Sequence, residues 1–480
     1  MSLFDIFKNK VVIYLASRYV IYGVQFITSL VIAAELGPYY MGIWGFILLI
    51  LQYFQQLHFG IANSFNILYI HHRENNAECN NYIGNSLILI SYLSLLVVVF
   101  YLYYIVFGIE SIEKYQIGRY VVWICLIAIL QYFVQFFINL FRVKNQLNKV
   151  TFCQSIIVLL NFFCIFFYRG ETLIQWLVFG YVLGNILCVA LAVISNCLPK
   201  LNKVQFSNEY QKEILKKGIY LFIYNSCLSF IIIIVRTIIS DNYTLEEFGT
   251  FTFSFSLANA FLLLLDALSF VIFPKFLGKL SSSNETTIVQ SSISFYREIY
   301  ITSAHLLIYL SIIVFPFILL FFPKYEGALV CLNLIALTIL MYTNSSGYIE
   351  LLISRNKEKL ASILSISALS LNSVLAIIMA YILHYDYEYI ILSTMITYVL
   401  YTIAVMCFAC KELKISFSYL ELFPRRLFIP YISALLISIF YNKYCIFIPM
   451  LLFAILNINS IKEIIKTAHS ILKSPDRVNL

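Results

Sequence analysis

The 480-residue chain has few charged residues and no long hydrophilic segment. Charged side chains make up 12% of the sequence, against roughly 25% in ordinary soluble domains, whereas 61% is hydrophobic. Nearly all of the chain must therefore lie in lipid. Such a composition leaves three classes of protein: a transporter, a channel or an integral membrane enzyme.

The sequence also lacks the common nucleotide-binding and hydrolase motifs. It contains no GxGxxG, GxxxxGK[ST], HExxH or GxSxG, so it shows neither an ATPase cassette nor a familiar hydrolase. The eleven cysteines form one CxxC, Cys407 and Cys410, with no second pair nearby. Free cysteine packs as a small apolar residue, and His71 and His72 lie in a short polar loop. We expect no catalytic residues, no metal site and no enzyme activity.

The apolar stretches are about 20 residues long, the length with which a helix crosses roughly 30 Å of hydrocarbon. A barrel would show shorter segments that alternate strictly, and residues 87–107 do not alternate. The fold class is therefore all-α and polytopic, with about 14 transmembrane helices (12–14). The predicted spans are 11–33, 43–65, 84–108, 119–141, 150–168, 173–198, 218–240, 249–273, 301–322, 327–349, 360–383, 388–410, 427–441 and 443–458.

Both ends of the sequence qualify this count. The last two stretches are short and are joined by little more than Asn442, so a re-entrant hairpin is the alternative to two full spans. The opening MSLFDIFKNK is too short and too polar for a cleaved secretion signal, and no small-residue cleavage site follows the first span. We therefore expect the first span to stay in the mature protein.

Lysine and arginine are distributed unequally between the loops. With a cytoplasmic N-terminus, 25 of the 32 lie on the cytoplasmic side, five on the other side, and Arg18 and Arg236 inside spans. The positive-inside rule then places both termini in the cytoplasm. An odd number of spans would scramble this asymmetry. The net charge of +8 thus reflects topology and does not indicate nucleic-acid binding.

Several spans carry polar residues at helical spacing, which places them on one face of each helix. The sets are Arg18, Tyr22, Gln25 and Ser29; Gln52, Gln56 and Asn63; Gln131, Gln135 and Asn139; Asn225, Ser229, Arg236 and Ser240; and Thr252, Ser256, Asn259 and Asp266. Such groups can join helices by hydrogen bonds. That account is weaker for Arg18, Arg236 and Asp266, because an unpaired charge at mid-membrane costs several kcal/mol. Such polar stripes, meaning polar residues aligned on one face of a helix, occur on many of the spans and indicate a shared polar cavity.

Two short segments at corresponding positions of the two halves look alike. Residues 35–46 follow the first span and residues 241–253 follow the seventh. Each begins with an acidic residue, and each has a glycine near the start of the next helix, Gly42 or Gly249, followed by aromatic residues. Repeat-built transporters are organised in this way.

The segment LGPYYMGIW at 36–44 resembles the LGPxxYG-aromatic signature of bacterial polysaccharide-biosynthesis membrane proteins. These are the O-antigen and oligosaccharide flippases of the MOP (multidrug/oligosaccharidyl-lipid/polysaccharide) exporter superfamily. LEEFGTF at 245–251 resembles their second-half element, and FRVKNQ at 141–146 and SRNK at 354–357 resemble their cytoplasmic turns. Met41 stands where the family usually has a tyrosine or a similar aromatic residue.

The resemblance implies two pseudo-symmetric six-helix lobes around a central polar cavity, with two extra C-terminal helices. On this layout residues 1–200 form the N-terminal lobe, 201–217 a cytoplasmic linker, 218–414 the C-terminal lobe, and 415–480 the extra helices and a tail. The implied location is the bacterial cytoplasmic membrane. The implied partners are membrane lipid, a polysaccharide polymerase and a chain-length regulator.

The implied substrate is a short oligosaccharide on undecaprenyl diphosphate, moved from the cytoplasmic to the outer leaflet by alternating access. Arginine suits a diphosphate because its planar fork forms bidentate, charge-assisted bonds. The candidate substrate-binding residues are Arg18, Tyr22, Gln25, Gln52, Gln56, Asn225, Arg236 and Asn259. No cofactor is expected other than a coupling proton or sodium ion. Asp266, the one acidic residue well inside a predicted span, is the candidate for that ion.

Three other interpretations stay open at this stage. A cation-coupled drug or metabolite antiporter of the same superfamily would favour an acidic lining, which Arg18 and Arg236 argue against. A membrane polysaccharide polymerase or acyltransferase would carry long external loops, whereas the longest external gap here is about 109–118. A scaffold without transport leaves the polar stripes unexplained.

Overall fold

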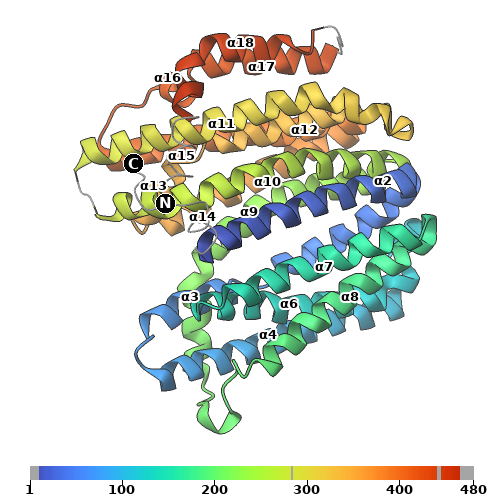
Figure 1. Cartoon of the computed structure of the whole chain (residues 1–480), viewed down its shortest axis with the longest axis vertical. Coiled ribbons are helices and arrows are strands. Elements are labelled where there is room, and N and C mark those ends of the chain that lie inside the picture. The colour runs from blue at the N-terminus through green and yellow to red at the C-terminus, as the bar shows by residue number, and fades with distance from the viewer. Residues whose placement is uncertain (1–9, 283–284, 441–444, 465–480) are drawn as a thin grey trace. The chain divides into compact units, whose positions relative to one another are not determined.

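The computed structural model describes residues 10–282, 285–440 and 445–464, in which helices follow one another and no strand occurs (Figure 1). All fourteen predicted stretches fall largely on helices of this part of the chain. Nine of its helices are long and apolar enough to cross a membrane, or ten if the bent pair α12 (Ala328–Thr343) and α13 (Tyr348–Ser354) forms one span. The protein is therefore an all-α, multi-pass membrane protein, as predicted.

The described chain divides into two compact units. The first comprises Met1–Ser229 and Thr244–Gly249, and the second Phe230–Tyr243 and Thr250–Leu480. The chain passes from one unit to the other within α9 (Asn208–Asn242) and returns briefly at the start of α10 (Leu245–Ser282).

The first unit packs α6 against most of its other helices. Its helices are α2 (Lys10–Gln56), α3 (Ile61–His71), α4 (Asn76–Phe107), α5 (Glu110–Lys114), α6 (Val121–Val143), α7 (Leu147–Phe167), α8 (Gly170–Ile194) and the first part of α9 (Asn208–Asn242). α2 and α8 each contact α6 and α7, and α3 and α4 cover another side of α6.

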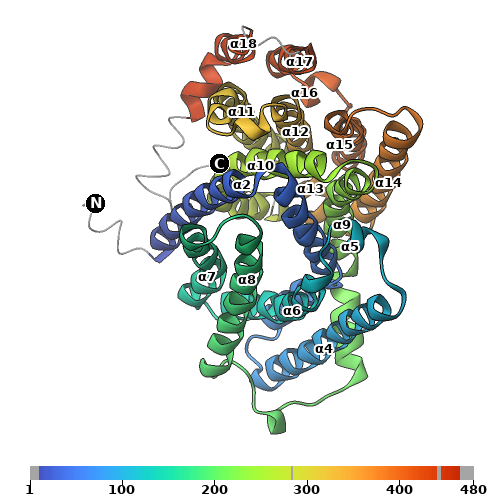
Figure 2. The same cartoon turned by 90° about the vertical axis from the view of Figure 1, so that its right-hand side faces the viewer.

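The second unit contains the rest of α9 and most of α10 (Leu245–Ser282). Its other helices are α11 (Thr286–Leu320), α12 (Ala328–Thr343), α13 (Tyr348–Ser354), α14 (Glu358–Ile377), α15 (Ile391–Leu413), α16 (Tyr419–Leu422), α17 (Arg425–Phe440) and α18 (Ile448–Leu456). α17 and α18 lie beside α11 and α12 (Figure 2). With 16 and nine described residues, both are shorter than the roughly 20 that a full span needs. Asn442, the predicted joint between them, lies outside the described residues.

The first predicted span and most of the second lie on one element, α2, which bends sharply at Gly37 (Figure 2). Gly37 has φ 65° and ψ 175°, a conformation that side chains disfavour. Pro38 follows it and has no N–H to continue the helical hydrogen bonds. The LGP sequence therefore turns the chain within one residue, in the gap between the predicted spans 11–33 and 43–65.

The second predicted span is also broken, between Gln56 and Ile61. At the end of α2 the Phe54 carbonyl accepts the Leu57 N–H, and the Tyr132 hydroxyl of α6 is its second donor at 2.9 Å. In the second unit, α12 and α13 are bent by 43° at residues 344–347. Buried Arg297 of α11 donates to the carbonyls of Asn344 and Ser346, the latter at 2.9 Å. Each break thus has a side chain from a neighbouring helix that donates to its backbone.

The predicted linker, residues 201–217, is tied to α4. The Asn81 side chain accepts from the Gln205 N–H at 2.7 Å, and the Asn85 side chain donates to the Gln205 carbonyl at 2.9 Å. Farther along, the Tyr82 hydroxyl donates to the Glu213 carboxylate at 2.8 Å. The predicted domain boundaries remain predictions, but these bonds fix the linker to the first unit.

The two glycines of the paired motifs touch. A Cβ at Gly42 would overlap the Leu245 carbonyl, and a Cβ at Gly249 would overlap the Pro38 carbonyl. Phe46 and Phe248, which follow or precede these glycines, both pack on buried Tyr115. The start of α10 therefore crosses the part of α2 that follows Gly37, and the two backbones are in direct contact. Small residues allow such a close approach.

We expect alanine at Gly42 or Gly249 to destabilise the protein by about 1–3 kcal/mol, the usual cost of overpacking. Neither obstacle is a side chain that can rotate away, because both are backbone carbonyls. The measurement is the thermal unfolding midpoint of the purified protein in detergent. Gly23→Ala is the matched control in the same helix, since a Cβ there meets no atom within 4 Å. Equal midpoints for the Gly42, Gly249 and Gly23 variants would contradict the crossing.

Candidate functional site

A polar cavity of about 270 Å³ lies within the first unit, inside the membrane-spanning helices. Its lining combines one arginine with four glutamines, an asparagine, a histidine and a tyrosine. These polar residues are Arg18, Gln55, His58, Gln131, Tyr132, Gln135, Gln154 and Asn185. Apolar residues of α6 and α7 complete the wall, and no Asp or Glu is among the described residues that line it.

Several helices contribute to this cavity because each carries its polar residues on the face it turns inward. Gln131 and Gln135 are four residues apart on α6 and therefore share a face. The Gln55 amide, near the end of α2, donates to the Gln131 side chain at 3.2 Å. Asn185 enters from α8 and donates to the Tyr181 carbonyl at 2.7 Å. The amides are thus held in place by neighbouring groups and line the wall as neutral donors and acceptors.

Arg18 is half-buried and supplies the positive charge of the lining. Its guanidinium donates to the Gln154 side chain of α7 and to the Tyr22 hydroxyl, one turn farther along α2. The guanidinium also lies over the Tyr22 ring, 5.1 Å from its centroid. Both of these partners are neutral. A charged oxygen entering the cavity would form stronger hydrogen bonds with Arg18 than they do.

The structure places the candidate residues of the first unit in different surroundings. Arg18 lines the cavity, and Tyr22 accepts a hydrogen bond from Arg18. Gln25 is exposed. Gln52 and Gln56 are half-buried and do not line the cavity. Asn225 of α9 is exposed.

The remaining candidates belong to the second unit. Arg236 is buried, with 2% of its surface exposed, and its guanidinium lies 5.4 Å from the centroid of the Phe255 ring. Asn259 is half-buried on α10. Asp266 lies on the same helix, but its side chain is outside the described residues. Arg18 and Arg236 thus belong to different units.

Sequence reasoning missed five polar lining residues: Gln55, His58, Tyr132, Gln154 and Asn185. Gln55 and His58 lie close to the stripe predicted at Gln52 and Gln56, and they flank the end of α2. Gln154 and Asn185 lie in mainly apolar stretches and belong to none of the predicted polar faces. The sequence marks them only because amide side chains are uncommon in membrane-spanning helices. That signal does not show which side of the helix faces a cavity.

The cavity should attract anions, and chemical labelling can measure this. We expect a cysteine at Gln135 to react about tenfold faster with a negatively charged methanethiosulfonate than with a positively charged one of similar size, a modest effect for a focused field. Arg18→Gln should abolish the preference. The rates are measured by mass spectrometry in a background without the native cysteines. A cysteine at exposed Arg73 in the loop after α3 is the control for intrinsic reagent reactivity. A cationic preference at Gln135 would contradict the electrostatic description.

Comparisons with known proteins agree with this architecture. The family model described as polysaccharide biosynthesis protein matches residues 7–278, more than half of the chain. A search of the curated proteins finds no match.

Solved structures of transporters share the fold. The lipid II flippase MurJ, in an inward closed conformation, matches 95% of this chain and 100% of its own, with a TM-score of 0.69 and 15% identity. An inward-facing multidrug resistance MATE family transporter of the MOP superfamily matches 83% of this chain and 98% of its own, with a TM-score of 0.64 and 12% identity. A MATE transporter of Vibrio cholerae matches 84% of this chain and 94% of its own, with a TM-score of 0.58 and 14% identity. The chain belongs to the polysaccharide biosynthesis protein family and has the fold of the MOP superfamily transporters.

Proposed function

We propose that the protein is a flippase that moves an undecaprenyl-diphosphate-linked oligosaccharide, an O-antigen or capsule-type repeat unit, across the bacterial cytoplasmic membrane. The observation that carries this proposal is the cavity around Arg18, which offers one cation and many neutral amides within the membrane-spanning helices. Membership of the polysaccharide biosynthesis family supports the substrate class. The protein is then a transporter and not an enzyme.

The lining suits both parts of such a head group. The diphosphate carries charge that would be costly in about 30 Å of hydrocarbon. Arg18 can replace its hydration with bidentate, charge-assisted hydrogen bonds. Sugar hydroxyls both donate and accept, as do the amides of Gln131, Gln135 and Gln154. The polyprenyl tail can remain in lipid throughout.

The same lining disfavours the drug antiporter. An organic cation needs a negative counterpart, and the described lining of this cavity has an arginine and no carboxylate. A polysaccharide polymerase would need catalytic groups at an external surface, whereas the polar groups of this cavity come from membrane-spanning helices. The flippase therefore uses the observed chemistry better than either alternative.

The direction of transport follows from the topology and from a driving force. The excess of Lys and Arg in alternate loops supports cytoplasmic termini and loading from the cytoplasmic leaflet. Asp266 is our candidate for coupling to a proton or sodium gradient, because a carboxylate in lipid must be neutral, paired or hydrated. Removal of the product by a polymerase with its chain-length regulator would also favour export.

The first test replaces the arginines in a strain whose own copy of the gene is deleted. Arg18→Ala or Arg236→Ala should abolish surface polysaccharide and leave lipid-linked oligosaccharide in the cytoplasmic leaflet. Arg18→Lys should recover only part, because the lysine ammonium lacks the planar fork. Leaflet position is measured by the accessibility of the sugars to an external glycosidase.

Arg73→Ala is the control, since Arg73 is exposed and lies outside the cavity. The variant proteins must also reach the membrane in normal amounts. Full surface display with both Arg18 and Arg236 replaced by alanine would remove the arginines from the mechanism.

The second test concerns coupling. Asp266→Asn should preserve substrate binding and remove the dependence of transport on the ion gradient, because the amide takes up no proton at working pH and has no negative charge to attract a sodium ion. Transport into vesicles is measured with and without a proton or sodium ionophore. Asp386→Asn, in an exposed loop, should keep the dependence. If transport by the Asp266→Asn variant still collapses with the gradient, Asp266 has only a structural role.

A further inference from the structure

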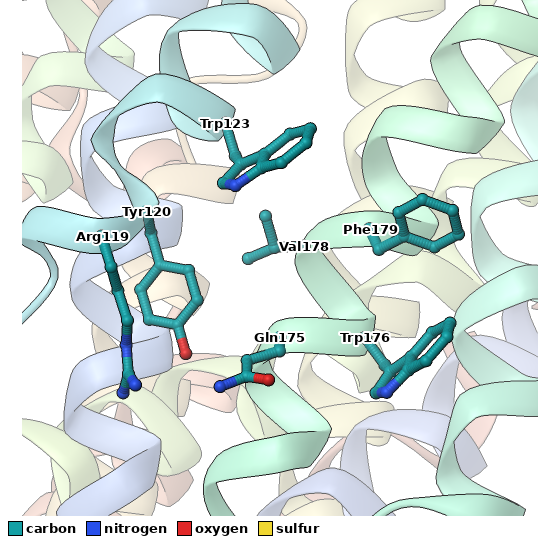
Figure 3. Close-up of a pocket in the computed structure, with 7 residues that line it drawn as sticks. All are labelled: Arg119, Tyr120, Trp123, Gln175, Trp176, Val178 and Phe179. Atoms are coloured by element: carbon teal, nitrogen blue, oxygen red, sulfur yellow. The ribbon is translucent and has the colours of Figure 1, made fainter.

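A second pocket, of about 380 Å³, lies between the beginnings of α6 and α8 in the first unit (Figure 3). Its size falls in the roughly 300–1,000 Å³ range of small-molecule sites. Two of the three tryptophans of the chain line it, Trp123 and Trp176, together with Arg119, Gln175 and Phe179. It shares no lining residue with the cavity around Arg18.

The pocket has a polar end and an apolar end. The Arg119 guanidinium, the Tyr120 hydroxyl and the Gln175 amide lie at one end, whereas Trp123 and Phe179 lie toward the other (Figure 3). The polar end is near the helix starts. Phe179 follows the first residue of α8 by nine residues, which corresponds to about 13 Å along the helix. The interfacial layer is about 5–8 Å thick, so the apolar end reaches the depth of the acyl chains.

The surroundings are open to lipid. Trp123, Trp176 and Phe179 are 44%, 39% and 46% exposed although they are large and apolar. Phe166 and Phe167, at the end of the neighbouring helix α7, are more exposed still. A pocket that is polar at the membrane surface and apolar below it fits a molecule with a head group and chains.

The charges at the polar end are paired. Arg119 forms an ion pair with Glu171, in the first turn of α8, and both side chains are about half exposed. Nearby on the chain, Arg169 pairs with Glu35 at 3.0 Å. An anionic head group would meet Glu171 as well as Arg119, whereas a head group that carries both charges can satisfy both.

The order of the two charges also matters. Arg119 lines the pocket, whereas Glu171 is absent from its lining and lies in the first turn of α8, four residues before Gln175. In an ethanolamine phospholipid the phosphate is next to the glycerol and the ammonium is farther out. Seated in this pocket, its phosphate would face Arg119 and its ammonium Glu171, with one chain along Trp123 and Phe179.

We propose that this pocket binds a zwitterionic phospholipid with a primary ammonium, the phosphate at Arg119 and the ammonium at Glu171. Arginine and phosphate form charge-assisted hydrogen bonds, and the ammonium can donate to the carboxylate. A quaternary ammonium has no N–H to donate, so a choline phospholipid keeps the charge and loses these bonds. The site is independent of the transport proposed above.

The test measures lipid binding to the full-length protein by native mass spectrometry. Phosphatidylethanolamine, phosphatidylcholine and phosphatidylglycerol with identical chains are titrated separately. Phosphatidylethanolamine should bind about tenfold more tightly than either, the equivalent of about one charged hydrogen bond. Equal binding of the three, which a general aromatic belt would give, would overturn the proposal, as would a preference for phosphatidylglycerol.

Variants locate the site and test the order of charges. Arg119→Gln and Glu171→Gln should each reduce the preference for ethanolamine to about twofold or less. The double exchange Arg119→Glu with Glu171→Arg keeps an ion pair and reverses its order, so it should also lose the preference while keeping the unfolding midpoint. Trp123→Ala should weaken binding of all three lipids, and Phe166→Ala, also exposed but outside the pocket, should not. An unchanged ethanolamine preference in both Gln variants and in the exchange would assign that preference to another surface and overturn the proposal.

Discussion

Backbone that leaves the helical conformation inside a membrane must find its hydrogen-bond partners in the protein, because lipid offers none. This chain departs from regular helix at several points within its spans. Tyr132 donates to the end of α2, and Arg297 donates to the carbonyls between α12 and α13. A polar side chain can also bond to backbone inside a regular helix: in the second unit, Asn372 of α14 donates to the Ile231 carbonyl of α9 at 3.0 Å. The polar residues of the spans therefore serve two purposes, and the protein uses some to hold the backbone and others to line cavities.

That division explains how far the structure could be predicted from the sequence. Helix positions follow from the length of apolar stretches, which a bilayer imposes on any sequence. Gln131 and Gln135 were placed on a common face because helical periodicity is local, and they do line one cavity. Helical periodicity does not predict the surroundings of Gln52 and Gln56 in the same way, because α2 ends at Gln56. Beyond the break, position along the chain no longer predicts which side of a helix faces inward.

The buried charges show a further limit. Arg18 and Arg236 look alike in the sequence, each an arginine within an apolar stretch on a polar stripe. In the structure Arg18 borders a cavity, whereas Arg236 is packed against Phe255 with 2% of its surface exposed. Arg297, which the sequence assigns to a cytoplasmic loop, is buried among carbonyl groups and the Tyr348 ring. The role of an arginine depends on what the neighbouring helices place around it, and one sequence does not contain that information in local form.

The contact between Gly42 and Gly249 bears on how such proteins diverge. Each glycine is in contact with a backbone carbonyl of the other segment. A larger residue at either position could therefore not be accommodated by a smaller side chain on the other segment. Compensatory substitution, the usual route by which packed pairs drift together, is closed here. In this chain, a larger residue at either glycine therefore requires the backbone of the other segment to move. The two segments set the scaffold of the first unit, whereas the cavity around Arg18 is lined by side chains, which can be exchanged without moving a backbone.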